Sequence, residues 1–180
     1  VTPISNNAGT FSFPVSGICN KIPMFVSKDN LGEAIAVHSK RNQPEFPTGN
    51  GFCMYIKREL LNEIGFFDEK LFPIGYGEEN DFCIRANQKG WKNTIDDSTM
   101  IFHKRSSSFK EKKIQLTKLS KDIINKKYPN FEKDVSSHSK SKILNTTRKQ
   151  IKEVFSNKDL ISNSNSKGIL YVLHDSVGGT

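Results

Sequence analysis

Glycine and proline interrupt the start of this sequence at short intervals, which limits the elements that can form there. Gly9, Pro14, Gly17 and Pro23 divide the first thirty residues, and residues 47–51 read Pro-Thr-Gly-Asn-Gly. Proline restricts the backbone and removes an amide donor, while glycine favours turns. Residues 1–30 are therefore predicted to form loops and short strands, and residues 47–51 a turn.

Two short helices are predicted in the middle of the chain. Apolar residues recur with helical spacing over 57–64 and 78–89, and a glycine follows each segment. The second helix is predicted to bury one face, made of Phe82, Cys83 and Ala86.

Strands are predicted from short apolar runs. One covers 52–56, a pair lies within 91–102 around two adjacent aspartates, and another covers 169–174. Residues 31–37 fit either a helical turn or a strand.

The positive charge is concentrated in one stretch. The chain carries 27 Lys and Arg against 19 Asp and Glu, but residues 1–100 hold 10 against 12, while residues 101–150 hold 14 against 4. A helix is predicted over 109–128, and residues 134–168 predict a solvated helix or a partly disordered linker. Lysines surround the helix predicted over 109–128 without interleaved aromatic residues, so nucleic acid is not the favoured partner. A solvated face and an anionic membrane surface both fit.

The cysteines indicate neither a disulfide framework nor a zinc site. Cys19, Cys53 and Cys83 are an odd number, widely spaced, with apolar neighbours. We expect buried free thiols in a reducing compartment.

The densest polar motif is residues 75–81, Gly-Tyr-Gly-Glu-Glu-Asn-Asp. It places Glu78, Glu79 and Asp81 in the first turn of the predicted helix 78–89, behind a glycine pair. The helix dipole and unpaired amides there favour ionised carboxylates, which can accept a proton from a hydroxyl. Ordinary N-terminal capping is the alternative.

The order of several motifs resembles a known family. Residues 48–54, 58–59, 65–69, 75–85 and 102–109 follow one another as in the C-terminal half of bacterial family 2 glycosyltransferases of GT-A fold, especially rhamnosyltransferase-like members. The resemblance covers roughly residues 1–135.

It implies an α/β fold in which residues 1–133 form the C-terminal part of a GT-A domain, with a mixed sheet and a basic helical extension. Residues 134–167 are then expected to be a linker. Residues 168–180, with a stub strand before a glycine loop, are similar to the start of a family 4, GT-B glycosyltransferase domain.

The resemblance also implies roles for individual residues. Glu79 is the favoured base, with Glu78 and Asp81 left open. His103 lies where the family often places a ligand to Mg²⁺ or Mn²⁺, although an ordinary histidine at a strand end is the alternative. The implied substrate-binding residues are Thr48, Gly49, Asn50, Gly51, Gly77 and Trp91.

One family motif is missing. No Asp-any-Asp occurs in the 180 residues, so the fragment is expected to be inactive alone, with the metal site completed from outside. The expected function is transfer from a nucleotide-sugar donor to a saccharide or lipid-linked saccharide acceptor in surface polysaccharide synthesis, in the cytoplasm or at the inner membrane face. A noncatalytic module that binds carbohydrate or an anionic surface is the alternative.

Overall fold

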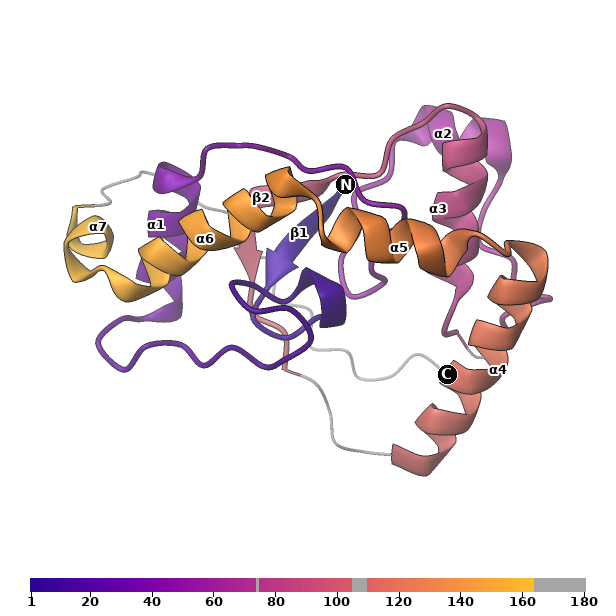
Figure 1. The fold of residues 1–180 in the computed structure, drawn as a ribbon, viewed down its shortest axis with the longest axis horizontal. Coiled ribbons are helices and arrows are strands. Elements are labelled where there is room, and N and C mark those ends of the chain that lie inside the picture. Colours follow the sequence, from indigo (N-terminus) through magenta and orange to yellow (C-terminus); the bar gives the residue numbers. More distant parts are fainter. Residues whose placement is uncertain (74, 105–109, 164–180) are drawn as a thin grey trace.

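The computed structural model describes residues 1–73, 75–104 and 110–163, with side chains from residue 114 onward in the last range. The chain is a mixed α/β protein (Figure 1). Its elements in order are β1 (Thr2–Ser5), the 3₁₀ turn η1 (Gly9–Phe11), α1 (Lys28–His38), α2 (Arg58–Ile64), α3 (Glu78–Gln88), β2 (Ile95–Ile101), α4 (Lys110–Lys127), α5 (Phe131–Ser139), α6 (Lys142–Ser156) and α7 (Lys158–Ser162).

The two strands pair in parallel, so the chain between them crosses over and carries α1, α2 and α3. Pro3 pairs with Asp96 and the next residue, Ile4, pairs with Met100, so β2 bulges between these pairs. Buried Asp97 lies in this bulge and accepts hydrogen bonds from the 39–43 loop. The predicted pair of strands within 91–102 is therefore wrong: one bulged strand is present.

Helix α1 decides the ambiguity at residues 31–37. Ser27 caps it, and Leu31, Ala34 and Ile35 are buried with the i, i+3, i+4 spacing of a helix face. The helices predicted over 57–64 and 78–89 are confirmed as α2 and α3. The second buries Phe82, Cys83 and Ala86 as predicted.

The predicted strand at 52–56 is wrong. Tyr55 exchanges two backbone hydrogen bonds with Val1 and is 69% exposed, whereas the Cys53 amide donates to the Asn50 carbonyl in a turn. A pairing of one residue does not extend into a ladder. The expected burial of the thiols holds for Cys83, whereas Cys53 is half-buried and Cys19 exposed.

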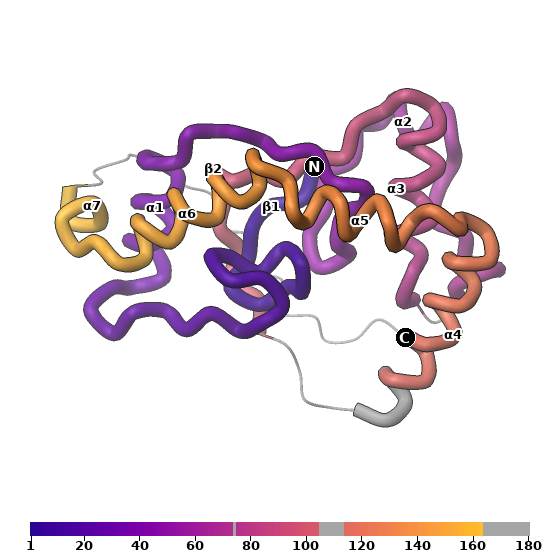
Figure 2. Tube along the Cα trace, in the orientation of Figure 1, coloured from indigo at the N-terminus to yellow at the C-terminus, as the bar shows by residue number. Residues whose placement is uncertain are grey.

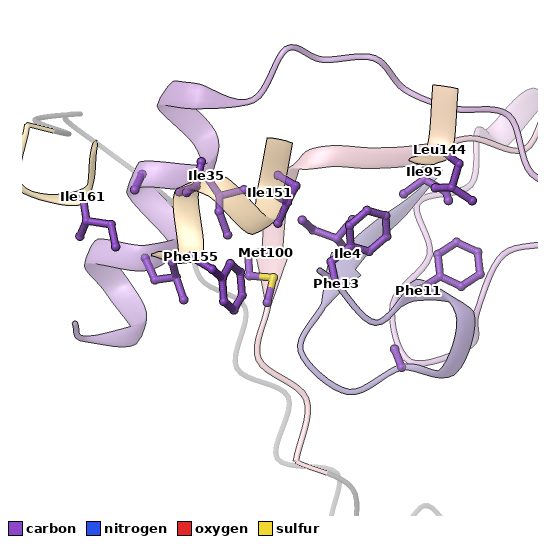
Figure 3. Close-up of a cluster of buried hydrophobic side chains, with 14 of the residues drawn as sticks. Ile4, Phe11, Phe13, Ile35, Ile95, Met100, Leu144, Ile151, Phe155 and Ile161 are labelled. Atoms are coloured by element: carbon purple, nitrogen blue, oxygen red, sulfur yellow. The ribbon is translucent and has the colours of Figure 1, made fainter. Parts of the chain in front are cut away.

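Helix α6 is part of the main hydrophobic core. Figure 3 shows its side chains among those of α1, β1 and β2, where Leu144 and Ile151 are at most 1% exposed. Arg148 of the same helix donates to the carbonyls of Thr10, Ser12 and Pro14. Residues 134–163 are thus not the expected linker, because their apolar face completes this core. The predicted strand 169–174 and the second domain at 168–180 lie outside the described residues.

At each end of the molecule, helices from different parts of the chain lie side by side. Helix α7 returns to α1 at one end of the molecule, while α4 lies beside α3 at the other (Figure 2). A smaller apolar cluster joins α2 to α3 through Leu60, Phe82 and Ala86. Within the part of the chain that the structure describes, no helix has the length and apolar character needed to cross a bilayer.

Candidate functional site

Gly77 is the N-cap of α3 and has a conformation that a side chain would not tolerate. Its φ is 115°, in the left-handed region that favours glycine. A β-carbon there would lie 2.1 Å from Ser120 Oγ of α4 and 2.9 Å from the Phe72 ring. Glycine is therefore required at position 77 both by the positive φ and by the lack of space for a β-carbon.

The turn at residues 48–51 docks on α3. Thr48 Oγ1 donates to Asn80 Oδ1 at 2.7 Å, and the Gly49 amide donates to Cys83 Sγ at 3.1 Å. Asn50 also reaches back to the carbonyl of Ala8. The structure thus brings together two motifs that the sequence singled out separately.

Glu78 extends from the start of α3 toward this turn. Its Oε1 lies 3.8 Å from the position of a β-carbon on Gly51 and 3.7 Å from one on Gly75. Its Oε2 is buried and has no hydrogen-bond partner among the described residues. Burial, and then the neighbouring charge of Glu79, raises the pKa of Glu78. Glu79 instead accepts a hydrogen bond from the Gly77 amide at 3.1 Å.

Asp81 is bound to its surroundings on every side. Its buried carboxylate accepts hydrogen bonds from Arg85 at 2.8 Å, Lys127 at 2.7 Å and Tyr128 at 2.8 Å. Burial alone would raise the pKa of Asp81, but these donors outweigh it and the pKa is lowered. A carboxylate held this way is a poor proton acceptor, so Asp81 is a structural partner of α4 and not a good candidate base.

Trp91 does not join the other candidates. It follows the C-terminal end of α3, a helix of 11 residues and about 16 Å at 1.5 Å per residue, whereas Glu78 lies at the start. Its indole N–H donates to Glu63 Oε2 at 2.7 Å, and its ring packs on the small apolar cluster. The structure therefore gives Trp91 a packing role between α2 and α3.

His103 lies near the 48–51 turn. Its ring stacks on Phe52, with centroids 5.4 Å apart, and its Nδ1 lies 3.0 Å from the Asn7 carbonyl oxygen. Among the described residues, no three His, Cys, Asp or Glu side chains lie close enough to hold a metal ion. These residues alone do not fit the expected divalent ion, which stays a prediction.

Three residues of this region have no sequence signal that points to their contacts here. Asn80 lies inside the acidic motif, and its link to Thr48 requires the fold to be known. Lys127 and Tyr128 reach Asp81 from 46 and 47 positions away. The helical spacing of apolar residues over 109–128 predicts their helix, but no local pattern indicates the partner of that helix.

The chain has no match among protein-family models, curated proteins or solved structures to which it was compared.

Proposed function

We propose that this chain forms the acceptor-side part of an inverting glycosyltransferase, which moves a sugar from a nucleotide-sugar to a hydroxyl of a saccharide. The observation that carries this proposal is the contact between the 48–51 turn and the start of α3. Thr48 and Asn80, 32 positions apart, join the two motifs, and Glu78 faces the bare backbone of Gly51. Such a backbone beside two carboxylates leaves room for a sugar ring near a base.

Glu79 is the base in this proposal. The Gly77 amide holds its carboxylate at the head of α3. As the acceptor oxygen attacks the anomeric carbon, its proton passes to Glu79 and the nucleoside diphosphate leaves from the opposite face, which inverts the configuration. The buried Oε2 of Glu78 has no hydrogen-bond partner among the described residues, so in this proposal the second carboxyl hydrogen-bonds a sugar oxygen.

The donor side must be supplied from elsewhere. The 180 residues contain no Asp-any-Asp motif, so in this proposal other residues bind the diphosphate and any Mg²⁺ or Mn²⁺ that stabilises it as it leaves. We therefore expect no transfer by these residues alone.

The proposal is tested by a transfer assay on the whole protein that carries this chain, with a panel of nucleotide-sugars and release of nucleoside diphosphate as the readout. Glu79→Gln should lower kcat by about 10²–10⁴-fold and leave the donor KM nearly unchanged. Glu69→Gln, at an exposed position in the preceding loop, is the matched control. Wild-type kcat in Glu79→Gln, or no donor consumed by the whole protein, would refute the proposal.

The surface of α4 favours an anionic membrane as the place where this reaction occurs. Ile114 is 66% and Leu119 58% exposed, beside exposed Lys118. Apolar and basic side chains together suit a surface of anionic headgroups over acyl chains. Co-sedimentation with phosphatidylglycerol vesicles should fall with added salt and in Leu119→Ser. Binding that is absent or insensitive to salt would argue against the membrane.

A further inference from the structure

A groove separates the C-terminal half of α3 from the junction of α4 and α5. It encloses about 390 Å³, and its walls include Pro47, Gln88, Tyr128 and Phe131. Figure 1 shows α3 close to the junction where α4 ends and α5 begins. The volume lies at the lower end of the range of small-molecule sites in proteins.

The walls of the groove combine ring faces with amide groups. Tyr128 and Phe131 are each only partly buried. Asn87 is held in place, because its amide donates to the Pro47 carbonyl at 2.9 Å and its Oδ1 accepts from Asn93. Fixed amides and flat apolar rings are suited to a ligand that has both hydroxyls and C–H faces.

Other polar side chains on the rim are not used by the fold. Asn130 is the N-cap of α5, yet its side chain makes no capping hydrogen bond. Gln88 and Asp134 are exposed, and no hydrogen bond of their side chains to another described residue is found. These groups are available to donate to and accept from a ligand.

The charge of the groove does not suit an anion. Its one lining cation is Lys127, among the described residues, and the Lys127 ammonium already binds the buried Asp81 carboxylate at 2.7 Å. The rim also carries the carboxylate of Asp134. A phosphate or an acidic sugar would therefore find the Lys127 ammonium already paired with Asp81 and would be repelled by the Asp134 carboxylate.

We propose that this groove binds a neutral saccharide, in a subsite separate from the carboxylates at the head of α3. Aromatic faces would take the C–H side of the sugar ring, and the free amides would take its hydroxyls. Pro47 lines the groove and directly precedes the 48–51 turn. The subsite and the proposed acceptor site are therefore connected by adjacent residues of the chain. The inference extends the proposed function by naming a neutral glycan, but saccharide binding here does not require transfer.

The experiment is saturation-transfer NMR and titration of the full 180-residue chain with maltose, cellobiose and lactose, each at about 10 mM, ten times a millimolar dissociation constant. Phe131→Leu keeps an apolar side chain but removes the ring, and Gln88→Ala removes an exposed amide. Each should weaken binding about three- to tenfold. Gln115→Ala, at an exposed glutamine on α4 outside the groove, is the matched control and should bind as the unmodified chain does.

Each other outcome overturns the inference. None of the three disaccharides binds, or binding persists unchanged in both variants, or inorganic phosphate binds and Lys127→Met abolishes that binding. If Phe131→Leu alters the fold, the exposed Gln88→Ala still decides the result. Failure of the proposed function is distinguishable, because Glu79→Gln should lower kcat for transfer in the whole protein by about 10²–10⁴-fold without changing disaccharide binding in the groove.

Discussion

Replacing Asp81 with asparagine tests how α4 is attached to the rest of the molecule. The Asp81 side chain is 0% exposed and accepts hydrogen bonds from three side chains. Two of these are Lys127, the last residue of α4, and Tyr128, which directly follows it. Arg85 also donates to the carbonyls of Ile64 and Phe66, so one carboxylate joins α2, α3 and α4.

The expected loss follows from the exposure of the partners. Removing one member of a buried ion pair costs about 3–5 kcal/mol. The side chains of Arg85 and Lys127 are 23% and 39% exposed, so water can solvate them in the variant. Asparagine also keeps one acceptor oxygen. We therefore expect Asp81→Asn to lose about 2–3 kcal/mol of unfolding free energy, which lowers Tm by about 4–12 °C at this chain length.

The loss should depend on pH in a defined direction. Because the pKa of Asp81 is lowered in the folded state, its stabilisation is present above the unfolded carboxyl pKa of about 3.9. It disappears as the pH falls through the lower folded value. The gap in stability between the wild type and Asp81→Asn should therefore be constant between about pH 6 and 8 and shrink below about pH 4.

Circular dichroism melts and urea titrations at several pH values measure this gap. Glu132→Gln is the control, since Glu132 is 53% exposed and pairs with an exposed lysine, Lys121. Breaking that surface pair should change the stability by less than about 1 kcal/mol. If Asp81→Asn and Glu132→Gln have the same stability at pH 7, Asp81 does not anchor α4.

Three further variants probe the same fold. Gly77→Ala should unfold at much lower urea than Gly90→Ala: both residues have positive φ, but only the first β-carbon meets other atoms within 4 Å. Ile151→Ala should cost about 2–5 kcal/mol in urea titrations, whereas Ile143→Ala, at a 46% exposed site on the same helix, should cost far less. Arg148→Met should lose about 2–3 kcal/mol in thermal melts, because backbone carbonyls near η1 lose their charged donor; unchanged melting would show that α6 needs no such anchor.

The sequence was sufficient for the elements whose signals are local. Gly65 and Gly90 both have positive φ at the ends of α2 and α3, where their predicted ends lie. The buried face of α3 also follows from helical spacing, as Phe82 shows. These features depend on the few residues around each position, and such signals lie within one stretch of sequence.

The candidate site was recognisable only in part. Its glycines and carboxylates formed a visible motif, but the sequence did not separate the roles of Glu78, Glu79 and Asp81. Their environments differ because Asp81 points into donors from α4, while Glu78 points toward the 48–51 turn. Both neighbours come from elsewhere in the chain.

Residues 134–163 show most clearly the difference between what local sequence indicates and what contacts between distant segments determine. Their composition is rich in serine, lysine and asparagine, which is typical of a solvated segment. Composition averages the exposed and the buried face of a helix, so it does not indicate that one face is buried. The ends of the short helices and the position of the acidic motif follow from local sequence alone. That α6 completes the core, and that Arg148 reaches Thr10, 138 positions away, follows only from the fold. Local stop signals act over one turn, whereas burial depends on which distant surfaces meet.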